Sequence, residues 1–356
     1  MPFIRSRSYA EVKNQLENSN SVLKWKPGMS LFNANGSIDS SSEGFRYTIQ
    51  TTTLIRPRVT EQKFYEIPFA DYIPVRVGEG AYLEEIKTNV EYQSAGDFES
   101  GIQGVGQETR ITNVATGLAP ITYKIKTWVK GYQYSIMELE KALASTNWNV
   151  VEGKHKALAK NWQLGLQRIA FLGSYTDNTG VPGLASNAQV NVNASTIGSQ
   201  ISAMNYTQFG ALVAAIMDDY FQNSNSTVYP DHFAIPQSDW NGLATPINPQ
   251  FPVAGSMMID YLMEAFKKIT GNPNFVIYPV AYLDKSRNAG VWTGAGTYRY
   301  ILYRKDEESM VMDVPLNLTQ LAPNTDNNFV WNGVAFGQFT GVQIIRVPEV
   351  RYYDHT

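Results

Sequence analysis

The sequence contains no cysteine among its 356 residues. Disulfides, thiolate zinc sites, iron–sulfur clusters and cysteine nucleophiles are therefore excluded. It also lacks any apolar run of the roughly 18 residues that a membrane-spanning helix needs, since Gly210–Met217 is among its longest apolar runs. The first fifteen residues hold no apolar segment and no cleavage site, so we expect no secretory signal and no membrane association.

Charge is scarce as well. Charged residues make up 17% of the chain, against about 25% in typical soluble domains. The 29 Lys and Arg nearly balance the 32 Asp and Glu, so the net charge of −3 provides no basic footprint for nucleic acid. Aromatic residues, in contrast, are plentiful, with 16 Phe, 7 Trp and 21 Tyr. Surfaces poor in charge and rich in aromatics are typical of protein interfaces, so the composition favours self-association over an ordinary globular protein rich in Tyr and Asn.

Motifs for catalysis and cofactor binding are missing. The three histidines are dispersed without metal-ligand spacing, and we expect His155 to be a solvated helix residue. The glycines of Gly101–Gly106 form G-x-x-G-x-G, which is not the dinucleotide fingerprint, and neither a phosphate-binding loop nor a G-x-S-x-G motif is present. The sequence therefore predicts no enzyme, no metal and no cofactor.

The N-terminal residues 1–70 predict an extended arm that becomes ordered on something else. A short helix is predicted at Tyr9–Glu17, and a stretch rich in Pro, Gly, Ser and Asn follows it. Two alternating runs come next, Tyr82–Tyr92 and Ile121–Val129, with a Gly-rich segment between them. They predict a long two-stranded ribbon. Because an isolated ribbon is marginally stable in water, we expect its apolar face to lie on another subunit.

The clearest helical pattern lies at Val150–Leu172, where Leu158, Trp162, Leu166 and Ile169 are spaced four, four and three residues apart. This spacing predicts that the four side chains pack on a sheet of the same subunit. Further helices are predicted at Ser135–Ala144, Phe209–Tyr220 and Met257–Ile269, and strands at Asn274–Pro279, Tyr298–Tyr303 and Gly341–Tyr353. Strands and helices do not alternate regularly, which indicates an α+β fold.

Four later segments add a family resemblance to this order of arm, ribbon and long helix. The segments are Gln163–Ser186, where the helix ends before a Gly-Leu loop, Asp231–Ala244, Asn272–Asp284 and Asn328–Tyr353. Together they resemble the major capsid proteins of tailed phages, which have the Hong Kong 97 fold. In that family the ribbon is an extended loop (E-loop), the long helix is the spine of a peripheral domain, and an axial domain follows.

The resemblance implies a structural subunit that assembles into hexamers and pentamers of an icosahedral phage head around double-stranded DNA. It implies these divisions: an arm at 1–75, the E-loop at 76–130, a peripheral domain at 131–200 and 312–356, and an axial domain at 201–311. The same fold serves encapsulin nanocompartment shells, which are one alternative. A glycan-binding β-rich protein, suggested by the Trp, Tyr and Asn content, is the other.

The resemblance also implies partners and contact residues. The E-loop would lie across a neighbouring subunit's peripheral domain, through Glu84, Glu85, Lys87, Glu91, Asp97 and Glu99. The spine helix would contribute Lys154, Lys156, Lys160, Trp162, Leu166 and Ile169. The segment from Glu79 to Glu108 contains seven acidic residues and one lysine, whereas Val151–Leu172 contains four basic residues and one acid. We therefore expect the E-loop of one subunit and the spine helix of its neighbour to attract each other.

Residues 1–60 are too short for a built-in scaffold, so a separate scaffold protein is implied, together with a portal and decoration proteins. Self-crosslinking relatives join an E-loop lysine to a peripheral-domain asparagine with the help of a nearby acid. Lys87 and Asn332 match those two positions, but the acid position falls near Phe339, and 327–348 contains no Asp or Glu. A neutral amine is scarce at neutral pH without such a base, so we expect no crosslink.

Overall fold

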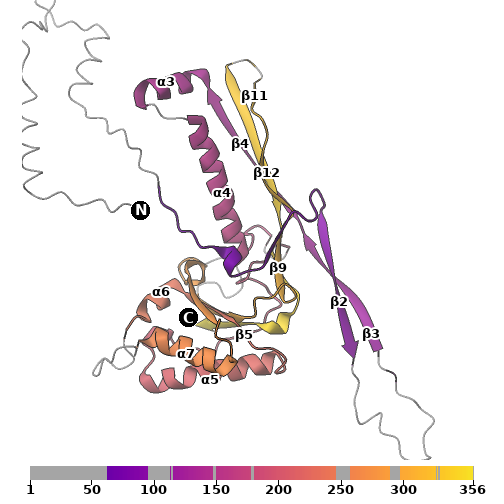
Figure 1. Ribbon diagram of the computed structural model, residues 1–356, viewed down its shortest axis with the longest axis vertical. Coiled ribbons are helices and arrows are strands. Elements are labelled where there is room, and N and C mark those ends of the chain that lie inside the picture. Colours follow the sequence, from indigo (N-terminus) through magenta and orange to yellow (C-terminus); the bar gives the residue numbers. More distant parts are fainter. Residues whose placement is uncertain are drawn as a thin grey trace, which may run out of the picture. The chain divides into compact units, whose positions relative to one another are not determined.

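The structure is a computed structural model and describes residues 62–94, 113, 115–146, 150–177, 180–245, 257–288, 297–325, 327 and 329–355 (Figure 1). The chain divides into two units, residues 1–62 and 63–356, and the elements below belong to the second. The predicted arm helix at Tyr9–Glu17 and the ribbon-tip residues Asp97 and Glu99 lie outside the described residues. None of the helices in the described ranges has the length and apolarity to cross a bilayer.

The helices follow the apolar spacing of the sequence. The spine helix begins and ends as predicted, and three others lie within three residues of their predicted bounds. The α-helices are α3 (Ile136–Thr146), α4 (Val150–Leu172), α5 (Tyr206–Asn223), α6 (Gln237–Gly242) and α7 (Met258–Thr270). Short 3₁₀ turns are η1 (Phe69–Asp71), η3 (Ile201–Ala203), η4 (Ala281–Leu283) and η5 (Val347–Glu349).

The helix ends have local causes. The Ser135 hydroxyl accepts a hydrogen bond from the backbone N–H of Glu138 at 3.2 Å, as an N-cap does. Helix α4 stops at Gly173, whose φ of 74° lies in the left-handed region. The chain then returns to the helix end, where a Cβ on Gly183 would lie 2.4 Å from the Gly173 nitrogen. Only glycine fits this approach, and it places Leu184 in the core.

The strands form four sheets. A three-stranded sheet has the order β1 (Val75–Val77), β9 (Met310–Val314), β13 (Val342–Ile344). In a four-stranded sheet, β12 (Val330–Phe339) pairs with β4 (Lys126–Ser135), β10 (Leu316–Gln320) and β11 (Asn324–Thr325). A five-stranded sheet has the order β5 (Val192–Asn193), β14 (Val350–His355), β8 (Tyr298–Tyr303), β6 (His232–Pro236), β7 (Val276–Val280). The ribbon consists of β2 (Glu85–Ser94) and β3 (Ala115–Lys124). Parallel and antiparallel pairs are mixed, in keeping with an α+β fold.

The second predicted ribbon strand is two strands, which corrects the prediction. The alternation of Ile121–Val129 continues in the sequence, but the ladder breaks at Ile125. The chain before this residue pairs with β2 as β3, and the chain after it pairs with β12 as β4. Before the break the odd-numbered residues are the more buried ones, and after it the even-numbered residues are. Val129 is therefore 61% exposed whereas Tyr132 is buried. The structure therefore divides the run between ribbon and body.

Helix α4 packs on one face of the four-stranded sheet. The Trp162 ring lies 5.4 Å from that of Trp128 on β4 and 6.1 Å from that of Phe339 on β12, and its Nε1–H donates to Asn317 Oδ1 at 3.1 Å. A Cβ on Gly337 would lie 2.5 Å from the Trp162 ring, so glycine makes room for the indole. Leu158 packs one turn earlier with other β4 and β12 residues. Leu158 and Trp162 thus pack on this sheet, as predicted, whereas Leu166 and Ile169 belong to the first apolar cluster described below.

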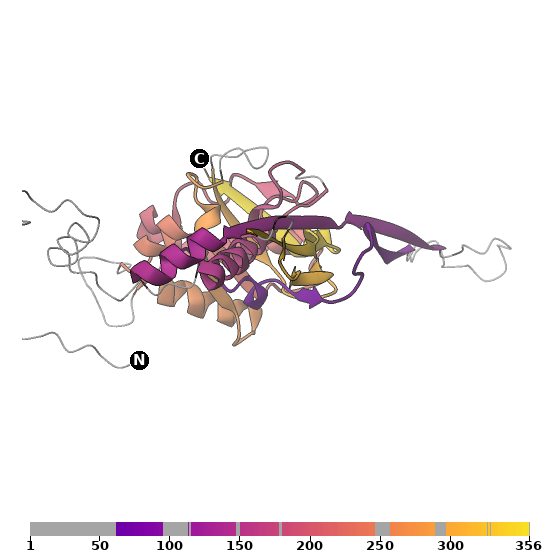
Figure 2. The ribbon, with the colours of Figure 1, turned by 90° about the horizontal axis from the view of Figure 1, so that it is seen from above.

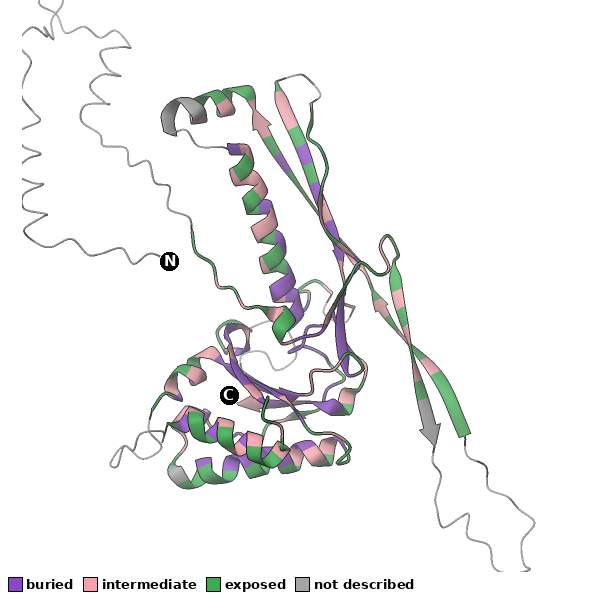
Figure 3. Ribbon diagram, in the orientation of Figure 1, coloured by how far each residue is buried: buried purple, intermediate pink, exposed green. Residues whose placement is uncertain are grey.

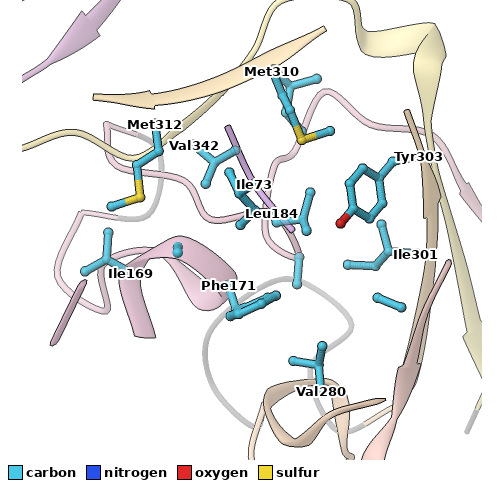
Figure 4. Close-up of a cluster of buried hydrophobic side chains, with 14 of the residues drawn as sticks. Ile73, Ile169, Phe171, Leu184, Val280, Ile301, Tyr303, Met310, Met312 and Val342 are labelled. Carbon is cyan, nitrogen blue, oxygen red and sulfur yellow. The ribbon is translucent and has the colours of Figure 1, made fainter. Parts of the chain in front are cut away.

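Two apolar clusters meet at the five-stranded sheet. The first joins the end of α4 to the three-stranded sheet, and Figure 4 shows Ile73 and Leu184 in its middle, between Ile169 on one side and Ile301 on the other. The second holds α5 and α7 against the other face, where Leu302 of β8 lies among Phe and Leu side chains of both helices. Neighbouring residues of β8 serve opposite clusters because successive side chains of a strand alternate.

Two predicted domain boundaries fall within described segments that the structure keeps together. A boundary at residue 75 cuts the segment that enters the core, since Ile73 is fully buried and β1 pairs with β9. A boundary at 311 divides β9 itself. The last strand, β14, pairs with β8 and β5 rather than with β12, so the C-terminus completes the sheet that α5 and α7 cover. Residues 350–355 therefore pair with a strand from the segment 201–311, which the sequence assigned to another domain.

Replacing Trp162 tests the α4 packing. The side chain is 4% exposed, and Trp162→Ala leaves a cavity that should lower the free energy of unfolding by ~3–5 kcal/mol. Urea denaturation of unassembled subunits measures this loss. The control is Val129→Ala on the exposed face of the same sheet, which should stay within about 0.5 kcal/mol. A Trp162→Ala subunit as stable as the control would contradict the packing.

Candidate assembly surfaces

The ribbon has two chemically different faces. Ten residues of β2 pair antiparallel with ten of β3, and residues directly opposite each other share a face. The ribbon apolar face consists of Ile86, Thr88, Val90, Ala119, Ile121 and Tyr123. The ribbon polar face consists of Glu85, Lys87, Asn89, Glu91, Leu118, Pro120, Thr122 and Lys124. Every residue of the polar face is exposed, whereas every residue of the apolar face is half-buried.

The apolar face is covered by its own subunit only at its base. There the Tyr123 hydroxyl donates to the Ile344 carbonyl at 3.4 Å, and burial raises the pKa of Tyr123 to about 12. Beyond this residue, Figures 1 and 2 draw the described part of the ribbon with no helix or third strand beside it. Figure 3 accordingly colours it exposed and intermediate but nowhere buried. Within the described part of the chain, the apolar face beyond Tyr123 thus has no covering element.

The predicted E-loop residues lie on the exposed side of this ribbon. Glu85, Lys87 and Glu91 belong to the ribbon polar face, and Glu84 stands just before β2. All four are exposed. They therefore border the apolar face rather than form it.

The lysines of α4 are already paired within the subunit. The ion pairs are Lys154 with Glu138 at 2.8 Å, Lys156 with Glu152 at 2.9 Å, and Lys160 with Glu66. The hydrogen bond from Lys156 holds the pKa of Glu152 below its ordinary value. Two of the acids come from outside the helix, so the positive surface counted along α4 is largely compensated. The other predicted helix residues, Trp162, Leu166 and Ile169, are buried in the subunit core.

The four-stranded sheet has a second face that α4 does not cover. Because Trp128, Tyr132 and Ala335 face the helix, the alternate residues point the other way. The outer sheet face consists of Val129, Gly131 and Gln133 of β4 with Asn332, Val334 and Phe336 of β12. None of these six residues is charged. Sequence reasoning missed this surface because it assigned Val129 to the ribbon.

His155 is not a solvated helix residue, which corrects the prediction. Its ring packs edge-on to Tyr132, with the centroids 4.8 Å apart, and its two nitrogens contact the Tyr132 hydroxyl and the Gln320 side chain. The histidine thus links α4 to β4 and β10. Among the described residues, no group of three or more His, Asp or Glu side chains has a metal-binding arrangement.

The predicted crosslink residues lie on separate surfaces. Asn332 is exposed on the outer sheet face, directly opposite Gln133 of β4 and Asn324 of β11. The position that would hold the acid, Phe339, packs its ring on Trp162.

Comparison with solved structures identifies the architecture. The capsid of Myoviridae phage XM1 matches with a TM-score of 0.69 at 18% identity, over 86% of this chain and 98% of that one. A structure from Mycobacterium phage Ogopogo matches with a TM-score of 0.54 at 14% identity, over 87% and 98%. The capsid of cyanophage P-SCSP1u matches with a TM-score of 0.53 at 13% identity, over 86% and 94%. No curated protein matches the sequence.

These likenesses define the class as an α+β protein with the Hong Kong 97-like capsid fold, as predicted. Within that class the chain belongs to the major capsid protein family, whose model matches residues 101–355. The protein is therefore a structural subunit of a virion capsid, which assembles with copies of itself. The family match supports the encapsulin alternative less than the capsid role.

The lack of Asp and Glu in residues 327–348, around Asn332, has a measurable consequence. A lysine amine attacks an amide only after it has lost a proton to a base, and this stretch of the chain supplies no carboxylate to accept one. Purified shells should therefore give a single band near the 39.8 kDa subunit in denaturing gel electrophoresis. A ladder of multimers that survives boiling would contradict this prediction, and Lys87→Arg would show whether Lys87 forms it.

Proposed function

We propose that this capsid subunit forms hexamers and pentamers of an icosahedral shell that encloses double-stranded DNA, and that its role is structural rather than catalytic. The observation that carries the proposal is the uncovered ribbon apolar face, because a second copy of the chain supplies the missing cover. A net charge of −3 suits DNA that a motor drives into the shell, since binding through phosphates requires clustered Lys and Arg.

Other partners follow from the same role. A separate scaffold protein would guide assembly, a portal would occupy one vertex, and decoration proteins would bind the finished shell. The arm would cross beneath neighbouring subunits, and the α5–α7 face of the five-stranded sheet would lie toward the capsomer centre.

Electron microscopy and nucleic-acid analysis of particles from phage-producing cells test the enclosed content. We expect closed icosahedral particles that protect double-stranded DNA from nuclease. Particles expressed without other phage proteins are the control, and they should be empty of genome-length DNA. Particles from phage-producing cells that hold protein cargo and no DNA would contradict the proposal and favour a nanocompartment.

We further propose that the ribbon apolar face docks on the outer sheet face of a neighbouring subunit. Both surfaces are apolar or uncharged, and both are two-stranded over ten-residue strands. Burying Ile121 and Val90 against Val334 and Phe336 would remove apolar area from water on both sides. The exposed acids, Glu84 among them, would border this contact and orient the approach, since exposed charges affect rate more than affinity.

Adjacent residues of β3 give a matched pair of variants. Ile121→Asp places a charge in the ribbon apolar face and should prevent shell assembly, because a buried unpaired carboxylate is strongly unfavourable. Thr122→Asp places the same charge on the exposed polar face and should assemble. Light scattering follows both, and circular dichroism checks that both subunits fold. Equal assembly of the two variants would contradict docking through the apolar face.

A further inference from the structure

The ribbon joins the body through two short legs. The first leg enters β2 through Gly78, Gly80 and Tyr82, whose φ angles of 92°, 80° and 66° all lie in the left-handed region. Tyr82 is the one of the three for which this conformation is unfavourable, because it carries a side chain. The second leg is the break at Ile125, whose N–H donates to the Glu84 carbonyl at 2.9 Å and so ties the legs to each other. Both legs are therefore places where the ladder stops and the chain changes direction.

One side chain fastens both legs to the body. The Gln338 carbonyl oxygen accepts a hydrogen bond from the Tyr82 backbone N–H at 2.8 Å. The Gln338 amide nitrogen donates to the Thr127 hydroxyl at 3.2 Å, just beyond Ile125. Gln338 is 8% exposed and lies at the end of β12, directly opposite Thr127 in the ladder. Its amide thus satisfies a donor from one leg and an acceptor from the other.

The remaining contacts of the legs are also polar. Lys126 pairs with Asp177 at 2.8 Å, and its hydrogen bond holds the pKa of Asp177 below its ordinary value. This pair is partly exposed, so water competes for both groups. Among the described residues, none between Gly78 and Ile125 belongs to an apolar core cluster. The direction of the ribbon therefore depends on a few hydrogen bonds. They are the two of Gln338, the bond from the Gly78 N–H to the Val314 carbonyl at 3.1 Å, and the bond from the Tyr123 hydroxyl to the Ile344 carbonyl at 3.4 Å, and only Gln338 contacts both legs.

We propose that Gln338 is a positioning residue that fixes the direction of the ribbon in the free subunit, and that this fixed direction makes the shell uniform. The proposal rests on the ribbon docking proposed above. A ribbon held in its docking direction loses less conformational freedom when it meets a neighbour. A ribbon that is free to move at its legs approaches the neighbouring subunit at many angles. Docking is then slower, and the shell closes with errors in its geometry.

The lack of native cysteine allows a direct measurement of ribbon direction. Spin labels at Asn89→Cys on the ribbon polar face and Ala157→Cys on α4 occupy exposed positions and are the only thiols. Pulsed electron paramagnetic resonance then gives the distance distribution between ribbon and body in unassembled subunits. With Gln338 present we expect one narrow distribution.

Three variants in this labelled background separate the contacts. Gln338→Met keeps the volume of the side chain and removes both hydrogen bonds, so the distribution should widen about twofold. Thr127→Val removes only the second bond and should give an intermediate width, and it also serves if Gln338→Met does not fold. Gln189→Met alters an exposed amide elsewhere and should leave the width unchanged. Gln338→Met or Thr127→Val distributions as narrow as the control would overturn the proposal.

Assembly provides the second readout. Unlabelled Gln338→Met subunits should assemble more slowly and give particles with a wider range of diameters by electron microscopy, while their thermal denaturation stays near that of the wild type. Shells as uniform as those of the wild type would overturn the assembly role of Gln338. Failure of the docking itself is distinguished by Ile121→Asp, whose assembly like wild type would contradict docking whatever the distances show.

Discussion

The packing of α4 against β12 is the contact on which the other surfaces of this subunit depend. The central positions of β12 that face the helix are Gly333, Ala335 and Gly337, and the two glycines lie against the rings of Tyr132 and Trp162. Small residues at every second position form a groove that only large side chains of the helix and of β4 fill. Because this inner face is held so closely, the alternate residues of β12 are held equally well. The outer sheet face and the Gln338 side chain are thus positioned by the core packing on the other side of the same strand.

The sequence predicts the helices of this fold better than its strands, for physical reasons. The bounds of α4 follow from information inside the segment itself, because its apolar residues recur every three or four positions and Gly173 stops it. The division of Ile121–Val129 depends on which strand each half pairs with. The alternation of the sequence continues through Ile125, so it does not reveal where the partner changes. The candidate site divides similarly. The ribbon and its exposed acids are visible in the alternation, whereas the partners of the α4 lysines come from distant segments that no local pattern reveals.

Two arginines of the subunit body form ion pairs that are largely buried within it. Arg299 forms an ion pair with Asp354 at 2.6 Å and donates to the Ala185 carbonyl, and Arg351 pairs with Asp219 at 2.7 Å. Both arginine pairs tie β14 or β8 to neighbouring segments at sites where little water reaches them. Losing one partner of such a pair leaves a poorly solvated charge, so these contacts specify the fold more than they add stability. The ribbon apolar face and the outer sheet face, by contrast, carry no charge. This distribution is the reverse of that in a monomeric protein and suits a chain that buries its last apolar surfaces only by association.

The ribbon apolar face and the outer sheet face are also carried by strands that are continuous in the chain. Strand β3 of the ribbon runs through Ile125 into β4, and β4 carries half of the outer sheet face. Gln338 is the penultimate residue of β12, which carries the other half. Under the proposed docking, a neighbour's ribbon would thus press on the two strands that direct the subunit's own ribbon toward the next copy. A shift in β4 or β12 would reach that ribbon through one residue of backbone and one side chain. The direction of each ribbon would then depend on whether the subunit has itself received one, which couples successive contacts around a capsomer without a change in the core.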